Sequence, residues 1–197
     1  MRNIHLLLVL ATSLLPFATV QAAPADLPET GQTTCYNTAG TVIPSCTGTG
    51  QDGDFKAGVA WPSPRFTVGT GAMAGCVTDN LTGLMWMGVP NNVPDTWVNA
   101  LTAADDLTLC GSSDWRLPNI NELESLVNSG AANQATFLND QGFTGVQAGN
   151  YWSSSSYAAT TRVGSPASAW VIYMHDGAVR AIDKSFNGLV WPVRAGQ

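Results

Sequence analysis

All four cysteines of this 197-residue chain lie downstream of a segment typical of a secretory signal peptide. Arg2 supplies a short basic start, residues 6–15 are mostly apolar, and Val20-Gln21-Ala22 fits a small-residue cleavage site. The apolar stretch falls short of the roughly 20 residues that a membrane-spanning helix needs. We therefore expect a cleaved signal peptide over residues 1–22, no membrane span, and secretion to the periplasm, the cell surface or the extracellular medium.

Export predicts that the cysteines form disulfides, because oxidising compartments favour these bonds. Four cysteines allow three pairings, and the sequence alone does not choose among them. Proximity along the chain favours Cys35–Cys46 and Cys76–Cys110, each contributing about 3 to 4 kcal/mol through loop closure. A zinc site is disfavoured, because no cysteine pair is spaced as C-x2-C and only one histidine, His175, follows the signal peptide. We expect no metal and no cofactor.

Charged residues are scarce in this chain. They make up 11% of the sequence, against roughly 25% in an average soluble domain, whereas Ser, Thr, Asn and Gln together number 54. The formal net charge of −6 argues against a nucleic-acid partner, which needs clustered Lys and Arg. The 45% hydrophobic content argues against disorder. The sequence thus predicts a folded domain with a polar but mostly uncharged surface.

Two regions follow the signal peptide. Residues 23–65 have few apolar runs and many Gly, Pro and Thr, which predicts an irregular N-terminal extension. Short β-prone segments recur over residues 66–197, which we expect to form one domain. Its first part should contain a hairpin over residues 66–78, a strand at 84–86 and a loop at Asn91–Pro94.

Two helices are expected in the middle of this domain. Asp95 or Thr96 can cap the first helix, whose buried face would be formed by Trp97, Ala100, Leu101 and Ala104. Asn119 precedes the second helix, and Glu122 stands three residues further on, close to a capping-box arrangement. The buried stripe of that helix would consist of Ile120, Leu123, Leu126 and Val127.

The C-terminal third of the chain is rich in β-prone residues. We expect strands at 170–174 and 179–182, joined by a tight turn at Asp176-Gly177, and a final strand at 189–191. Residues 151–169 show little periodicity and are predicted to form a long loop. Long loops in compact domains tend to be functional.

Four local motifs, in order along the chain, resemble those of one family, the C-terminal domain of the bacterial collagen-like adhesin Lcl. They are Val77–Trp86, Asp114–Asn119 followed by Glu122-Leu123, Tyr151–Ser155 and Val190–Arg194. The resemblance covers about residues 66–197. It implies an α+β, C-type-lectin-like domain with two helices, a small antiparallel β core and long loops that present a binding face. It also implies adhesion, with sulfated polysaccharides as ligands of the adhesin itself.

The candidate residues fall into two sets. We assign a structural role to residues within or close to the motifs of the resemblance: Trp86, Trp115, Arg116, Pro118, Glu122, Trp152 and Trp191. We assign ligand binding to side chains in the C-terminal loops: Ser155, Tyr157, Arg162, His175, Arg180, Lys184 and Phe186. The ligand would be a cell-surface protein or a glycan. The alternative is a structural or assembly module of a surface complex, and homo-oligomers are a further expectation.

An enzymatic function is not expected. A Ser nucleophile needs a His base held by a third group, and the serines at 153–156 have only His175 available in the exported chain. Formylglycine-generating enzymes share the implied fold, but they need redox cysteines near the C-terminus, and none follows Cys110.

Residues 151–197 also mix aromatic residues with small polar ones. This layout suits a protein whose codons are varied by a diversity-generating retroelement, which we carry as a hypothesis.

Overall fold

The β-prone segments assemble into two sheets in the computed structural model, which describes residues 27–158 and 167–196. One sheet has the strand order β1-β2-β3-β9 and the other the order β4-β8-β5-β6-β7. The strands of the first sheet are β1 (Phe66–Val68), β2 (Cys76–Asp79), β3 (Leu84–Met87) and β9 (Val193–Ala195). Those of the second are β4 (Asn91–Asp95), β5 (Asn150–Ser156), β6 (Ser168–Tyr173), β7 (Ala178–Asp183) and β8 (Gly188–Val190).

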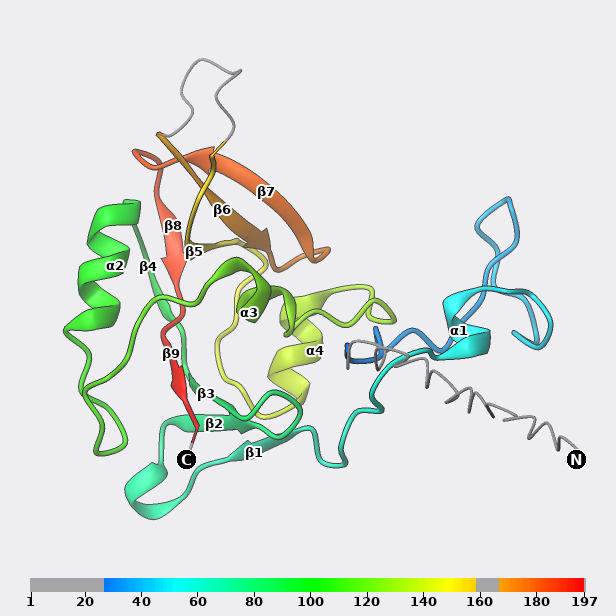
Figure 1. Ribbon diagram of the computed structural model, residues 1–197, viewed down its shortest axis with the longest axis horizontal. Coiled ribbons are helices and arrows are strands. Elements are labelled where there is room, and N and C mark those ends of the chain that lie inside the picture. The colour runs from blue at the N-terminus through cyan, green and yellow to red at the C-terminus, as the bar shows by residue number, and fades with distance from the viewer. Residues whose placement is uncertain (1–26, 159–166, 197) are drawn as a thin grey trace, which may run out of the picture.

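Helices α2 (Trp97–Asp105), α3 (Ile120–Glu124) and α4 (Gln134–Asp140) cover the two faces of the five-stranded sheet (Figure 1). Helix α1 (Asp52–Phe55) lies apart from this sheet, and a short 3₁₀ helix occupies Gly71–Met73 between β1 and β2. Ala100 and Ala104 of α2 pack on one face of the sheet, against Val171 of β6 and Trp152 of β5. Leu123 of α3 and Leu138 of α4 pack on the other. The fold is therefore α+β, as expected.

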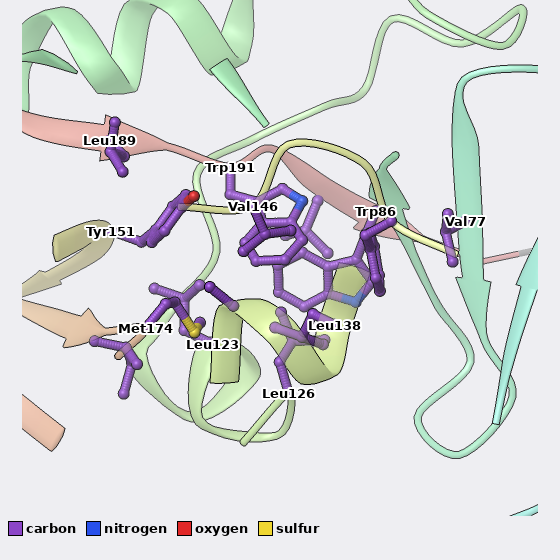
Figure 2. Packing of buried hydrophobic residues seen from close by; sticks show 14 of the residues in the cluster. Val77, Trp86, Leu123, Leu126, Leu138, Val146, Tyr151, Met174, Leu189 and Trp191 are labelled. Atoms are coloured by element: carbon purple, nitrogen blue, oxygen red, sulfur yellow. The ribbon is translucent and has the colours of Figure 1, made fainter. Parts of the chain in front are cut away.

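Trp191 lies at the centre of the main core, where β8 passes into β9 and so joins the two sheets (Figure 2). Its ring centroid is 5.7 Å from that of Trp86, 5.1 Å from that of Phe143 and 5.3 Å from that of Tyr151. Edge-to-face aromatic packing of this kind adds about 0.5–1.5 kcal/mol per pair beyond the area buried. Trp86, Trp152 and Trp191 are fully buried, and Trp115 is 1% exposed.

The N-terminal extension is described from Leu27 and contains one helix, α1. Its Cys35–Cys46 disulfide closes a loop that projects from the side of α4, away from α2 (Figure 1). The extension is anchored at its two ends. The backbone N–H of Ser129 donates to the carbonyl of Thr30, and Trp61 lies 4.0 Å beneath the buried guanidinium of Arg65. Burial lowers the pKa of Arg65, against the opposing effect of its partner Asp79.

Several local predictions were wrong. Residues Asn91–Pro94, expected as a loop, belong to β4, because the chain pairs with β8 despite Pro94 and a shift in register. Part of the expected loop over 151–169 is the strand β5, whose serines gave no alternating pattern because both faces of this strand are covered or polar. Residues 159–166 of that loop lie outside the described residues.

The expected number of helices was also wrong. The domain contains α4 in addition to the two expected helices, and the polar sequence of α4 gave no apolar stripe. Its first turn is fixed by tertiary contacts, because the N–H groups of Gln134 and Ala135 donate to the carbonyls of His175 and Met174. Helix α3 ends at Glu124, so Leu126 and Val127 lie beyond it.

Two details of the sheets also differ from the expectation. The β core is not wholly antiparallel, since β5 and β8 pair in parallel. The strand expected to be last, at 189–191, is followed by β9. Among the described residues no helix is long and apolar enough to cross a membrane.

Candidate functional site

The segment before α3 holds Arg116 in a fixed position at the surface. Asn119 caps α3, because its side chain accepts a hydrogen bond from the N–H of Glu122 (2.9 Å) while the Glu122 carboxylate accepts from the N–H of Asn119 (2.8 Å). The same carboxylate takes both ends of the Arg116 guanidinium, at 2.7 and 2.6 Å. Arg116 also donates to the carbonyl of Leu117. Glu122 thus completes the capping box of α3 and also pairs with Arg116.

The electrostatics of this pair keep both groups charged. Burial raises the pKa of Glu122, but the hydrogen bonds from Arg116 and from the N–H of Asn119 outweigh it, so the net pKa is lowered. The hydrogen bond to Glu122 raises the pKa of Arg116. The arginine side chain remains 46% exposed. A guanidinium has five N–H donors, so this arrangement leaves donors that face solvent.

A cleft of about 340 Å³ opens between α2 and the segment that carries Arg116. Two leucines and four polar side chains line it: Leu101, Thr102, Asp105, Arg116, Leu117 and Ser154. Ser154 belongs to β5 and is held there by two bonds to the carbonyl of Pro118, from its N–H (2.7 Å) and from its hydroxyl (3.2 Å). The walls of the cleft are therefore formed by a helix, a strand and the capped turn before α3.

A cation and an aromatic ring adjoin this cleft along α2. The ammonium of Lys184 lies 4.0 Å from the ring centroid of Trp97 and donates to the hydroxyl of Ser156 at 2.7 Å. Trp97 is itself fixed, because its indole N–H donates to the carbonyl of Ser153 and its backbone N–H donates to that of Lys184. Trp97 and Leu101 are four residues apart on one helix and so are neighbours on its surface.

The cleft and the Lys184 cluster thus lie next to each other on α2 and β5, and we call the two together the α2–β5 surface. Its members are Trp97, Leu101, Thr102, Asp105, Arg116, Leu117, Ser154, Ser156 and Lys184. It carries two fixed cations, an acidic side chain, three hydroxyls and part of an indole ring. Such a surface can donate to and accept from a polar ligand while contacting its apolar faces.

Two further residues that we predicted as ligand-binding lie at the same end of the sheet. Phe186 is 64% exposed in the turn that follows Lys184. Tyr157 follows β5, is half-buried, and meets the ring of Trp170 edge-on at 4.9 Å. Arg162 lies outside the described residues.

The remaining predicted ligand-binding residues lie elsewhere. His175 and Arg180 are exposed at the opposite end of the β6–β7 hairpin, where both contact Tyr173 and where Arg180 also pairs with Asp176 at 3.2 Å. The hydroxyl of Ser155 accepts a hydrogen bond from the backbone N–H of Ile120 (3.1 Å), so this serine anchors α3 to β5. The structure therefore brings Lys184 into the α2–β5 surface, with Tyr157 and Phe186 beside it. The side chains of Ser155, His175 and Arg180 lie outside that surface.

Sequence reasoning missed most of the cleft. Thr102, Asp105, Ser154 and Ser156 were not singled out, and Arg116 was assigned a structural role only. The sequence did contain one signal, the run of serines at 153–156, but it does not show which hydroxyls face the cleft. Within the described parts of the chain, no group of three or more His, Cys, Asp or Glu side chains could hold a metal ion.

The described residues thus define a disulfide-linked α+β domain with a surface cleft lined by both polar side chains and leucines. The family model of the Lcl C-terminal domain matches residues 75–194, and the chain belongs to this family. This membership makes it an adhesin-associated domain, as the four sequence motifs indicated. The match starts at Gly75, so β1 and the N-terminal extension precede it. No curated protein matches the chain.

Proposed function

We propose that this chain is an exported adhesion domain with a C-type-lectin-like fold, which binds a cell-surface glycan through the α2–β5 surface without chemical catalysis. The observation that carries the proposal is the cleft lined by Arg116, Asp105 and Ser154, with the Lys184–Trp97 cluster one helical turn away along α2. Membership of an adhesin-associated family and the two disulfides are consistent with a function outside the cell.

A glycan fits the chemistry of this surface better than a protein side chain or a free ion. Sugar hydroxyls donate and accept hydrogen bonds, and the surface offers Arg116 and Lys184 as donors and Asp105 as an acceptor. The leucines and the indole of Trp97 can contact the C–H faces of a sugar ring. A volume of about 340 Å³ is at the lower end for small-molecule pockets, roughly 300–1,000 Å³. We therefore expect the cleft to hold one unit of a longer chain.

Binding of the secreted protein to a glycan array, followed by titration calorimetry with the best glycan, tests this proposal. Lys184→Met removes the ammonium but keeps most of the aliphatic stem, and it should weaken binding at least fivefold. Arg180→Met is the matched control, because it removes one exposed cation from the other end of the same hairpin. Equal losses in both variants would point to a general charge effect and would contradict the proposed surface.

The assembly alternative predicts a different result. A chain that binds no glycan and no surface protein, yet forms defined oligomers, would favour an assembly module over an adhesion domain.

The hypothesis of a diversified C-terminal region is separate from both. It predicts a reverse transcriptase gene and a template repeat of codons 151–197 beside the gene, and a neighbourhood that lacks both would refute it.

A further inference from the structure

We infer that the cleft of the α2–β5 surface binds an uncharged sugar unit with free hydroxyls in preference to a sulfated one. This inference rests on the proposed function, because it names the class of glycan that the same cleft holds. It follows from the hydrogen-bonding capacity of the cleft, from its unpaired carboxylate and from the partners of the arginines.

Three of the four polar side chains in the cleft present hydrogen-bond acceptors. The hydroxyl of Thr102 donates to the carbonyl of Val98 at 3.2 Å. The hydroxyl of Ser154 donates to the carbonyl of Pro118, also at 3.2 Å. A hydroxyl has one proton to donate, so both groups can only accept from a ligand. Asp105 accepts only, as every carboxylate does, and this part of the cleft therefore needs a ligand that supplies donors.

The carboxylate of Asp105 also makes the cleft unfavourable for an anion. Asp105 is exposed at the last residue of α2, and the four ion pairs among the described residues do not include it. The last turn of α2 contains no basic residue. The C-terminal end of a helix carries a partial negative charge, which adds to that of the carboxylate. A sulfate group would be repelled here and has no donor to offer, whereas sugar hydroxyls can donate to Asp105.

The arginines of the domain are already neutralised by carboxylates. Each arginine that the structure describes belongs to one of four ion pairs: Arg65–Asp79, Arg116–Glu122, Arg180–Asp176 and Arg194–Asp114. In the cleft, both ends of the Arg116 guanidinium are bonded to Glu122. A sulfate would compete with this carboxylate for the same planar fork. A sugar hydroxyl needs only one of the remaining N–H donors of Arg116.

The formal charges of the α2–β5 surface cancel. Arg116 and Lys184 carry one positive charge each, and Asp105 and Glu122 carry one negative charge each. Binding of a polyanion depends on an excess of cations that displaces counterions, and the whole chain has a formal net charge of −6. A neutral sugar requires no such excess, so both the charge and the acceptors of the surface favour it.

Matched polysaccharides test the class of ligand. Dextran, mannan and galactan, each as the neutral polymer and as its sulfated derivative, are titrated into the secreted protein by calorimetry. The best neutral polymer should bind about tenfold more tightly than its sulfated derivative, the difference expected for one lost charge-assisted hydrogen bond. Its affinity should change less than roughly twofold between about 0.05 and 0.5 M NaCl, because salt screens mainly ionic contacts.

The outcomes separate this inference from the proposed function. Tighter binding of the sulfated polymers, with an affinity that falls steeply with salt, would overturn the inference and leave glycan binding intact. Binding of neither kind of polymer would refute the proposed function and the inference with it. The O-methylated form of the best neutral polymer lacks donors but carries no charge, so it should bind weakly. Undiminished binding of that form would also overturn the inference.

Asp105→Asn tests the acceptor directly. The variant removes the charge but nearly keeps the size of the side chain, so it should weaken binding of the best neutral polymer about tenfold and reduce its advantage over the sulfated derivative. Asp106→Asn is the matched control, because Asp106 is also exposed but does not line the cleft. The control should bind as the wild type does. Equal effects of the two variants would indicate the net charge of the chain as the cause and would overturn the inference.

Discussion

The two disulfides should contribute very differently to the stability of the domain. In the loop-closure model, a separation of 34 residues for Cys76–Cys110 gives about 4 kcal/mol, and a separation of 11 for Cys35–Cys46 gives about 3 kcal/mol. The first bond ties β2 to the loop after α2 and lies in a small core with Met85 and Trp115. The second closes a loop inside the extension, whose residues contribute little to the main core.

We therefore expect the double variant Cys76→Ala/Cys110→Ala to lower the free energy of unfolding of the domain by about 3 to 4 kcal/mol. The matched variant Cys35→Ala/Cys46→Ala should lower it by less than about 0.5 kcal/mol, because its loop can open while the domain stays folded. With a urea dependence of about 2 kcal/mol/M, the first variant shifts the unfolding midpoint by nearly 2 M.

Urea unfolding followed by tryptophan fluorescence measures both effects, because four of the seven tryptophans are buried in the cores. The two variants differ only in which loop is opened, so each controls for the loss of a cystine. Equal shifts for the two variants would refute the reasoning, since they would mean that the extension and the domain unfold as one unit.

Three further predictions concern the core, its pH dependence and the cap of α3. Gly188→Ala should destabilise the domain by about 1–3 kcal/mol in urea unfolding, because the added Cβ would stand 2.7 Å from the indole nitrogen of the buried Trp152. Burial raises the pKa of Tyr151 to about 12, despite the hydrogen bond that its hydroxyl accepts from the N–H of Gln147. The neutral Tyr151 hydroxyl therefore contributes up to about 3 kcal/mol to the free energy of unfolding. This contribution is fully present below pH 10 and is lost as the pH rises toward 12. Wild-type stability should fall relative to that of Tyr151→Phe across this range, and a constant difference would contradict the assignment. Glu122→Gln keeps a residue type that completes a capping box but removes the charge that pairs with Arg116, and it should cost about 0.2–1 kcal/mol at neutral pH. Because the pKa of Glu122 is lowered on folding, the gap to wild type should be full above the unfolded-state pKa of about 4.3 and should narrow as the pH falls below it, and a gap that does not depend on pH would count against the ion pair.

The sequence predicted those parts of the fold that local chemistry determines. The hairpin at 66–78 forms from two β-prone segments whose Gly-rich connection, residues 69–75, contains a 3₁₀ helix. The β6–β7 hairpin forms around Asp176-Gly177, where Gly177 adopts a φ of +77°. The capping box at Asn119 also needs only residues three apart. Each of these signals lies within one element or one turn, so no tertiary information is required to recognise it.

The elements that sequence reasoning missed depend on distant partners. Helix α4 is held by the carbonyls of Met174 and His175, some 40 positions away, and strand β4 exists because β8 lies beside it. The cleft has the same origin, since Thr102, Arg116 and Ser154 meet only when α2, the cap of α3 and β5 are packed together. A pattern within one segment cannot show such a meeting.

The four serines at 153–156 show how an uncharged sequence can serve structure and surface at once. Ser153 is fully buried and donates to the carbonyl of Trp170, and Ser155 accepts from the N–H of Ile120, so these two fasten β5 to its neighbours. Ser154 lines the cleft and Ser156 accepts from Lys184. Ser154 is also bonded to the carbonyl of Pro118, so serines of one short run both fasten the strand and line the cleft without any difference in residue type. The scarcity of charge in this chain therefore does not imply an inert surface, because the few cations present are fixed beside hydroxyls whose positions the fold itself determines.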